Sequence, residues 1–275
     1  MVAPPGRAPT PLPTVAQACA RAGVTVREVH SGAECVAGAA LLADIWGTAA
    51  EAAPLQSDVL LSLGHAGGAV LGAFAGDELI GLTVGIAGRP GSPELYSLIA
   101  GVAAAAAGRG VGVALKLAQR DWALAHGATR MRWTYDPLIR RNAHFNLNRL
   151  GAHIVEFVPD FYPPMTDAVN AGDLTDRLIA VWDFVDPRPP VSVPAGAETV
   201  LAAGDDEEPV LTPGGPGPWL IETPTDIEAI RRADPTRAHR WRLALREVLH
   251  RAERLDYRVL GFTGDGAYLA GRGDR

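Results

Sequence analysis

The sequence is poor in cysteine and has no surplus of basic residues, and each shortage excludes a class of protein. Cys19 and Cys35 are the only cysteines among 275 residues. Two thiols are too few for a disulfide framework, and their spacing suits no metal site. We therefore expect a cytoplasmic protein without a metal. The formal net charge of −6 argues against nucleic acid or an anionic membrane as a partner.

Long hydrophobic runs are absent as well. The chain holds no stretch of 18 apolar residues, which is about the length that a membrane-spanning helix needs. Its first segment, MVAPPGRAPTPLP, lacks the apolar core of a signal peptide. This segment is rich in proline, which predicts a disordered arm. Together with a short helix expected at 14–22, it makes residues 1–23 an N-terminal extension.

The sequence does have many apolar residues and many glycines. Apolar residues make up 48% of the chain, enough for a sizeable core, and glycine occurs 31 times. Gly108, Gly110 and Gly112 stand close together at the start of the segment AGRGVGVALKLAQRDWALAHGA. Apolar residues then recur at three- and four-residue steps. This spacing predicts an amphipathic helix that begins directly after the glycines.

These glycines favour a binding loop for an anion. Glycine permits positive φ and lets backbone amides approach a ligand with no Cβ in the way. The unpaired N–H groups of a helix's first turn, together with the helix dipole, then attract phosphate. The spacing is neither the dinucleotide-binding GxGxxG nor the P-loop GxxxxGK[ST]. The alternative is a glycine-rich junction that serves only the tight packing of a strand against a helix.

The remaining pattern predicts an α/β protein with a mixed sheet. Strand-like alternation and helical periodicity follow one another without the regular repeat of a parallel βα fold. Strands are expected at 24–29, 94–104, 130–135, 152–158 and 176–184, a hairpin at Gly76-Asp77, and helices at 35–47, 58–68 and 140–151.

A change in composition divides the chain. Residues 187–218 are rich in proline and glycine and hold four consecutive acidic residues, which predicts a linker. We therefore expect a main domain over 24–186 and a small α+β unit over 219–275. That unit buries too little surface to fold alone, so we expect it to pack on the main domain. Its pattern predicts a single helix of about 25–30 residues from Asp226, followed by a hairpin.

The glycine segment and the later RNAHFNLNRLGA resemble the GNAT superfamily, the Gcn5-related acyl-CoA N-acyltransferases, over residues 24–186. With WTYDP and the C-terminal tail, the chain looks like a bacterial subgroup of predicted GNAT acetyltransferases over nearly its whole length. The resemblance implies a GNAT fold: a mixed, mostly antiparallel sheet whose fourth and fifth strands splay apart. It also implies that acetyl-CoA, or another short acyl-CoA, binds in that wedge.

The resemblance implies which residues hold coenzyme A. The pantetheine would run along strand four, and backbone amides of the glycine loop would bind the pyrophosphate. The family usually has Gln or Arg at the loop position that is Ala107 here, although Arg109 can still supply charge. Asn142 and Asn146 lie on a helix that borders the cofactor in the family; capping or solvated side chains are the alternative for these two. The coenzyme A contacts predicted in this way are Leu98, Ala100, Val102, Gly108, Arg109, Gly110, Val111, Gly112, Val113, Asn142 and Asn146.

The family's usual catalytic side chains are missing from this chain. Leu147 occupies the position of the tyrosine that protonates the thiolate in many relatives, and strand four has no matching glutamate base. We predict Tyr135, at the end of strand five, as the acid and His144 as the base. A half-buried aromatic and a packed or solvated histidine are the alternatives. Arg242 and Arg246 share a helix face, which favours a solvated basic face over a carboxylate site.

These observations predict an acyl-CoA-dependent N-acyltransferase. Its acceptor would be the amine of a small metabolite, such as an amino acid, which attacks the thioester directly. An O-acyltransferase is a second enzyme hypothesis. A third is an acyl-CoA-binding or regulatory protein of the same fold without turnover. We expect no nucleic-acid or membrane partner, and the sequence leaves open whether the chain forms a homodimer.

Overall fold

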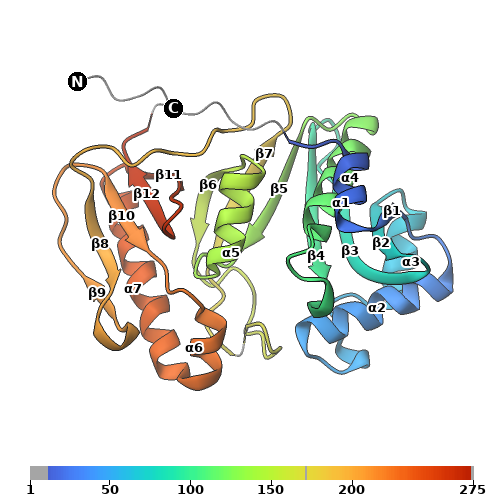
Figure 1. Ribbon diagram of the computed structural model, residues 1–275, viewed down its shortest axis with the longest axis horizontal. Helices are drawn as coiled ribbons and strands as arrows, with labels where there is room; N and C mark the ends of the chain where they lie inside the picture. Colours follow the sequence, from blue (N-terminus) through green and yellow to red (C-terminus); the bar gives the residue numbers. More distant parts are fainter. Residues whose placement is uncertain (1–11, 171, 274–275) are drawn as a thin grey trace.

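The computed structural model describes residues 12–170 and 172–273, which form two β-sheets with helices packed on them (Figure 1). Most of the predicted disordered arm, residues 1–11, lies outside the described part. The short helix expected after it is present as α1 (Val15–Ala22). Within the described ranges, no helix combines the length and the apolar character that crossing a bilayer requires.

The first sheet has seven strands in the order β1-β2-β3-β4-β5-β7-β6. Every neighbouring pair is antiparallel except β4 and β5, which are parallel. This confirms the predicted mixed, mostly antiparallel sheet. The strands are β1 (Thr25–Glu28), β2 (Ala69–Ala75), β3 (Glu78–Ala87), β4 (Glu94–Val102), β5 (Arg130–Tyr135), β6 (His153–Val158) and β7 (Arg177–Asp183).

The parallel strands β4 and β5 touch only at their beginnings. Their register joins Glu94 to Arg130 and ends with Tyr96 opposite Arg132. From there β4 continues beside β3, whereas β5 pairs along its whole length with β7. Figure 1 shows the two strands separating and the sheet opening into two halves. The predicted splay is therefore present, and it frees the backbone edge of β4 that faces β5.

Helices cover both faces of the half of the sheet that contains β1 to β4. Helices α1 and α4 (Val111–Ala125) share an apolar cluster with one face, which includes Ala73 and Ile80. Helices α2 (Gly32–Trp46) and α3 (Ser57–His65) pack on the other face, against residues such as Leu82. Successive side chains of a strand point to opposite faces. Because helices cover both faces, nearly every side chain of the central strands β2 and β3 is buried.

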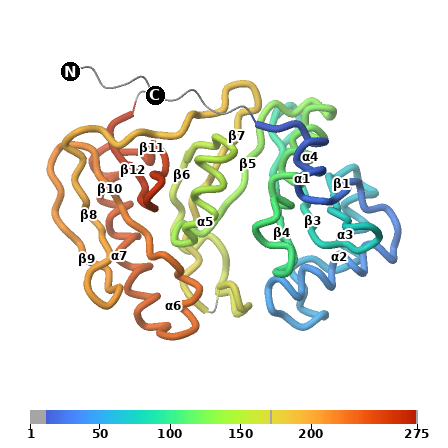
Figure 2. The backbone as a smooth tube through the Cα atoms, in the orientation of Figure 1, coloured from blue at the N-terminus to red at the C-terminus, as the bar shows by residue number. Residues whose placement is uncertain are grey.

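The chain then passes to the other half of the sheet, as the tube in Figure 2 shows, and ends in a second sheet beyond β6. Its five strands are ordered β11-β12-β10-β8-β9. They are β8 (Glu198–Ala203), β9 (Pro209–Leu211), β10 (Trp219–Glu222), β11 (Arg258–Phe262) and β12 (Ala267–Gly271). The predicted linker at 187–218 is therefore wrong in its second part. Residues 198–211 form β8 and β9, and β8 is fixed by parallel pairing with β10.

The single long helix predicted from Asp226 is two helices, α6 (Ile227–Ala233) and α7 (Pro235–Arg254). They meet at Asp234, whose side chain accepts a hydrogen bond from the N–H of Arg237 and so caps α7. Pro235 follows at the first helical position, where a missing N–H costs nothing. A proline there disfavours helical geometry at Asp234, so the first helix ends before it.

The two sheets share one apolar core. Tyr135 at the end of β5 and Leu138 directly after that strand belong to the same buried cluster as Trp219 and Trp241 from the C-terminal part. The prediction that residues 219–275 pack on the main domain is thus consistent with the observed contacts. The remaining short elements are α5 (Arg140–Ala143), the π-helical turn η3 (His144–Arg149), and the 3-10 turns η1 (Ala50–Ala52), η2 (Ala104–Ala106) and η4 (Asp205–Glu207).

Candidate active site

The glycine loop links β4 to α4 and leaves backbone donors unused. Gly108 and Gly110 have φ values of +75° and +89°, a region that side-chain-bearing residues rarely adopt. No side chain caps α4. In the described part of the chain, the N–H groups of Gly110, Val111 and Gly112 have no hydrogen-bond acceptor. A Cβ added at any of the three glycines would meet open space, so a ligand can reach these donors.

Arg109 and Val113 complete the loop in different ways. The Arg109 side chain is exposed and donates to the carbonyl oxygen of Ala22 at 3.3 Å, at the end of α1. This contact places the guanidinium beside the loop. The N–H of Val113 is already paired with the carbonyl oxygen of Gly110. The N–H of Arg109 donates to the carbonyl oxygen of Ala106 at 3.4 Å. Of the predicted pyrophosphate donors, Arg109 and Val113 therefore have amides that are engaged within the protein.

Strand β4 carries an irregularity at the point where it leaves β5. Val84 of β3 pairs with Ile99, and the next residue, Gly85, pairs with Ser97. Leu98 is thus an extra residue on β4, a β-bulge that turns backbone groups out of the ladder. Leu98 and Ala100 line a cavity at this edge. Val102 lies at the end of the strand, next to η2 and the glycine loop.

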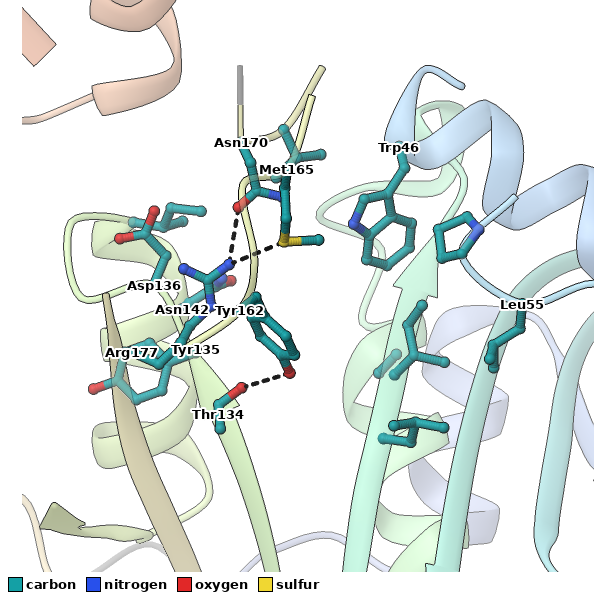
Figure 3. A pocket seen from close by; sticks show the side chains of 16 residues that line it. Trp46, Leu55, Thr134, Tyr135, Asp136, Asn142, Tyr162, Met165, Asn170 and Arg177 are labelled. Carbon is teal, nitrogen blue, oxygen red and sulfur yellow. Dashed lines mark hydrogen bonds between the residues drawn. The ribbon is translucent and has the colours of Figure 1, made fainter. Parts of the chain in front are cut away.

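A cavity of about 310 Å³ fills the space between the diverging strands (Figure 3). One wall comes from β4 and from the segment that contains Trp46 and Leu55. The opposite wall comes from the end of β5, from α5, and from the connection between β6 and β7. Its lining residues are Trp46, Pro54, Leu55, Leu98, Ile99, Ala100, Thr134, Tyr135, Asp136, Ile139, Asn142, Tyr162, Met165, Val169, Asn170 and Arg177.

The Tyr135 hydroxyl does not face this cavity. Tyr135 is only 5% exposed, and its ring turns away from the cavity in Figure 3. Its hydroxyl accepts a hydrogen bond from the Tyr268 hydroxyl at 3.4 Å. Burial raises the pKa of Tyr135 well above its ordinary value. The prediction of Tyr135 as the acid at the reacting centre is wrong because the alternation of β5 directs its ring into the core.

Three hydroxyl groups missed by the sequence analysis do gather in the wedge. Thr134, the neighbour of Tyr135, points to the cavity side, and its Oγ1 lies 3.2 Å from the Tyr162 hydroxyl. Tyr96 stands at the last paired position of β4 and β5. Burial, and next to it the Tyr162 hydroxyl, raise the pKa of Tyr96 to about 12. Thr134 could have been found from the alternation of RMRWTY, but nothing local marks Tyr162.

Asp136 lines the cavity but is fully engaged. Its Oδ2 accepts hydrogen bonds from Arg231 at 2.6 Å and from Arg242 at 2.8 Å, and its Oδ1 accepts one from the Leu138 N–H at 2.9 Å. Burial alone would raise the pKa of Asp136, but Arg242 and Arg231 outweigh it, and the pKa lies far below its ordinary value. Asp136 is therefore a permanent anion and a poor base.

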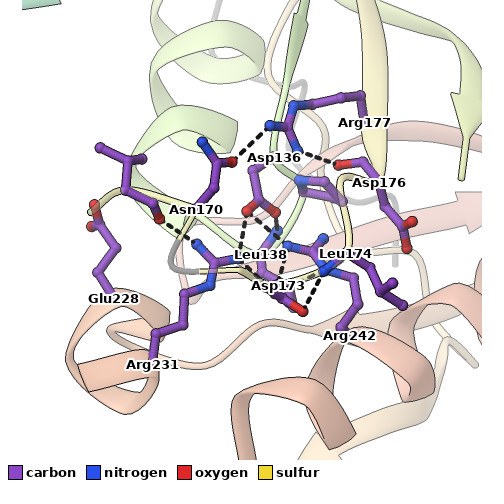
Figure 4. Close-up of polar contacts among 12 residues, drawn as sticks. Asp136, Leu138, Asn170, Asp173, Leu174, Asp176, Arg177, Glu228, Arg231 and Arg242 are labelled. Carbon is purple, nitrogen blue, oxygen red and sulfur yellow. Dashed lines mark hydrogen bonds and ion pairs between the residues drawn. The ribbon is translucent and has the colours of Figure 1, made fainter. Parts of the chain in front are cut away.

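The arginines of the C-terminal helices are not a solvated face. Arg242 is completely buried, and both it and Arg231 also contact the Asp173 carboxylate. Arg246 binds Asp176, and it binds Asp160 at 2.9 Å. Figure 4 shows the part of this network around Asp136, Arg231 and Arg242. The expected basic surface is an ion-pair network because carboxylates from the 136–176 region reach these arginines.

The three other predicted residues on the helix after β5 do not all reach the cavity. His144 is exposed, and its Nδ1 lies 3.1 Å from the Asn148 amide. It does not line the cavity, so its predicted place at the reacting centre is wrong. Asn142 does line the cavity, whereas Asn146 is 4% exposed and lies outside it. Asn146 belongs to the π-helical turn that begins at His144.

The described residues contain no group of three or more His, Cys, Asp or Glu side chains that could hold a metal ion. Cys19 and Cys35 are free thiols.

Comparisons with known proteins found no matching family model and no matching curated protein. Among solved structures, an acetyltransferase of the GNAT family from Streptococcus pneumoniae is 14% identical and covers 57% of this chain and 97% of its own, with a TM-score of 0.48. The ribosomal-protein-S18-alanine N-acetyltransferase from Escherichia coli is 12% identical and covers 58% and 94%, with a TM-score of 0.48. The yncA protein from Salmonella typhimurium, solved with its cofactor acetyl-CoA, is 18% identical and covers 63% and 98%, with a TM-score of 0.47. The first of these structures is described as a member of the GNAT family, which the glycine segment of this chain resembles. The fold of this chain itself is described by its strand order and by the divergence of β4 from β5.

Proposed function

We propose that this protein is an acyl-CoA-dependent N-acyltransferase that acts on the amine of a small metabolite. The observation that carries this proposal is the continuity of three features: the free edge of β4, the cavity beside it, and the unpaired amides of the glycine loop at its end. An edge strand can bind an extended ligand through backbone hydrogen bonds. A helix N-terminus binds phosphate. Acyl-CoA combines an extended pantetheine arm with a pyrophosphate.

Bound acetyl-CoA would supply the activated acyl group, and the chain's own residues would hold it. The amides of Gly108, Gly110, Val111 and Gly112 would bind the pyrophosphate, and the backbone of β4 would bind the pantetheine. The bulge at Leu98 would direct a backbone N–H toward the thioester oxygen, where it stabilises the developing negative charge. Trp46 and Leu55 would exclude water from the reacting centre.

Proton transfer falls to the hydroxyl groups of the wedge in this proposal. The amine nitrogen forms a bond to the acyl carbon, the carbon–sulfur bond breaks, and the thiolate takes a proton. Tyr162 would donate that proton, because its hydroxyl lies at the cavity and is held by Thr134. The amine's own proton would leave through water, since Asp136, the only carboxylate among the described residues that line the cavity, is bound to two arginines. Orientation of the two reactants supplies the rest of the acceleration.

The engaged Asp136 also favours a second candidate, an acyl-CoA-binding protein without turnover. Binding of acetyl-CoA with no transfer to any amine or alcohol of a test panel would support this candidate. Transfer to alcohols alone would support an O-acyltransferase. Release of free thiol, measured with each acceptor, separates the three functions.

The glycine loop offers a direct test of coenzyme A binding. Gly112 is the best position, because its backbone is not in the positive-φ region and a Cβ there meets open space. Gly112→Asp adds a negative charge beside the proposed pyrophosphate site, whereas Gly112→Ala adds only a methyl group. We expect calorimetry to show acetyl-CoA affinity at least about tenfold lower for the aspartate, or about 1.4 kcal/mol, and little changed for the alanine. Equal affinities of the two folded variants would place the cofactor elsewhere.

A further inference from the structure

A buried arginine forms part of the cavity wall and has no carboxylate partner in the part of the chain that the structure describes. Arg177, on β7, is 6% exposed, and its guanidinium lies at the cavity between Asp136 and Tyr162 (Figure 3). Its Nη1 donates to the carbonyl oxygen of Asp176 at 2.9 Å. Its Nη2 donates to Oδ1 of Asn170 at 2.9 Å and lies 3.9 Å from Sδ of Met165. All three of these acceptors are neutral.

The other arginines of this region are compensated. Arg231 and Arg242 each contact the carboxylates of Asp136 and Asp173 (Figure 4). Arg246 contacts the carboxylates of Asp160 and Asp176. Among the residues that the structure describes, Arg177 forms no ion pair, and its Nε–H has no acceptor. The nearby Asp136 carboxylate directs its oxygens to Arg231 and Arg242 instead.

The guanidinium carbon of Arg177 lies 5.2 Å from the centre of the Tyr162 ring, whose face offers a weak attraction. A buried cation that is held only by this ring and by neutral acceptors is costly, and an anionic ligand lowers that cost. A guanidinium forms charge-assisted hydrogen bonds with the oxygens of a carboxylate or a phosphate, and the Nε–H of Arg177 is a donor still available for one. The rest of the wall is largely apolar, with Trp46, Leu55, Ile139 and Met165 among its residues. A cavity of about 310 Å³ admits a small molecule with an apolar part.

We propose that Arg177 binds the carboxylate of the acceptor, so that the acceptor is a free amino acid with an apolar side chain. This inference rests on the proposed function, which supplies the reaction at the amine. The carboxylate takes no part in that reaction. Its contact with Arg177 holds one end of the acceptor on the β7 side of the wedge and leaves the amine to face β4.

Binding of product-like probes tests this proposal without requiring turnover. We would titrate the protein with N-acetyl-L-leucine and N-acetyl-L-methionine, and with the carboxamide of each, by calorimetry. We expect the acids to bind roughly 10–100-fold more tightly than the amides, the size of one or two charge-assisted hydrogen bonds. Equal binding of acid and amide, or binding of neither acid, overturns the proposal. Tighter binding of N-acetyl-phosphoethanolamine than of both acids overturns the assignment to a carboxylate.

Substitutions assign the preference to one side chain. Arg177→Met should abolish the preference for the acids, and Arg177→Lys should keep part of it, since the charge remains and the fork is lost. Arg149→Met is the matched control, because Arg149 is exposed, lies outside the cavity, and loses the same charge. A preference that survives in folded Arg177→Met overturns the proposal. Where Arg177→Met does not fold, the comparison of acid with amide on the unmodified protein decides.

Acetyl-CoA affinity, measured on the same samples, keeps the two proposals apart. Intact acetyl-CoA binding with no preference for the acids overturns the role of Arg177 and leaves the proposed function standing. A clear preference for the acids in a protein that does not bind acetyl-CoA overturns the proposed function and leaves the carboxylate site.

Discussion

Lys116 is a lysine in the protein interior, on the face of α4 that packs against β4. Its side chain is 5% exposed. Its Nζ donates to Ser97 Oγ at 2.7 Å and lies 4.2 Å from the centre of the Trp133 ring. No acidic side chain forms a salt bridge with it among the described residues. Burial therefore lowers the pKa of Lys116 to about 7, and folding at lower pH must desolvate a charge.

The stability of the protein should depend on pH through this residue. In the unfolded chain a lysine titrates near pH 10.4, so between pH 7 and 10 the unfolded state binds more protons at Lys116. Its contribution to stability then rises with pH in that window and is least favourable below it. We expect Lys116→Met to remove this slope, which is on the order of 1 kcal/mol per pH unit. Urea unfolding of both proteins at several values from pH 6 to 9 measures it, and parallel stability curves would contradict it.

At the scale of the element, β5 shows how one strand serves two purposes. Met131, Trp133 and Tyr135 alternate into the core, and Thr134 lies on the side that meets Tyr162. The strand also pairs with β4 at only its first three positions, whereas it pairs with β7 along its whole length. One face of β5 therefore carries the Thr134 hydroxyl that borders the cavity. The other face packs in the core that the first sheet shares with the C-terminal part.

A pair of variants that each remove one phenol oxygen tests this division. Tyr162→Phe should lower turnover by about 10²–10⁴, the range for a lost general acid, with acetyl-CoA affinity unchanged. Tyr135→Phe should leave turnover nearly unchanged and lower stability by about 0.5–1.5 kcal/mol through the lost hydrogen bond to Tyr268. Thiol release and thermal unfolding measure both. The reverse outcome would return the acid role to Tyr135.

At the scale of the whole molecule, ion pairs and a shared core join the C-terminal sheet to the wedge. Arg231 and Arg242 come from α6 and α7, and both bind Asp136, which directly follows β5 and lines the cavity. The two arginines do not line the cavity themselves, but they fix the position of Asp136, which does. Helices α2 and α3 cover one face of the first half of the first sheet. In the second half, the C-terminal part shares the buried core with β5 and β7 and so supports these strands.

Breaking this network should destabilise the entire protein. Arg242→Met leaves the buried carboxylates of Asp136 and Asp173 with too little positive charge, and we expect a loss of about 3–5 kcal/mol. Arg141→Met breaks the pair with Glu228, which also joins the two parts but lies at the surface, and should cost at most about 1 kcal/mol. Urea unfolding provides the comparison. Similar losses for the two variants would show that burial of the network contributes little.

Some features could be read from the sequence because neighbouring residues determine them. The hairpin at Gly76-Asp77, the strand at 130–135 and the glycine loop depend on side-chain alternation, helical periodicity and permitted φ values. These signals suffice for the α/β class and for the loop that opens α4. They also place Leu98 and Ala100 on the strand that borders the cavity.

Other features depend on residues that lie far apart in the chain. Tyr135 is buried against Tyr268, which lies 133 residues later. The charge partners of Asp136 are Arg231 and Arg242. Strand β8 is fixed by its pairing with β10. The sequence by itself determined the local elements and the glycine loop that opens α4, since each needs only a few consecutive residues. Only the tertiary structure decided which hydroxyl faces the wedge and which arginine is left without a carboxylate, because both depend on contacts between segments that the chain brings together only when it folds.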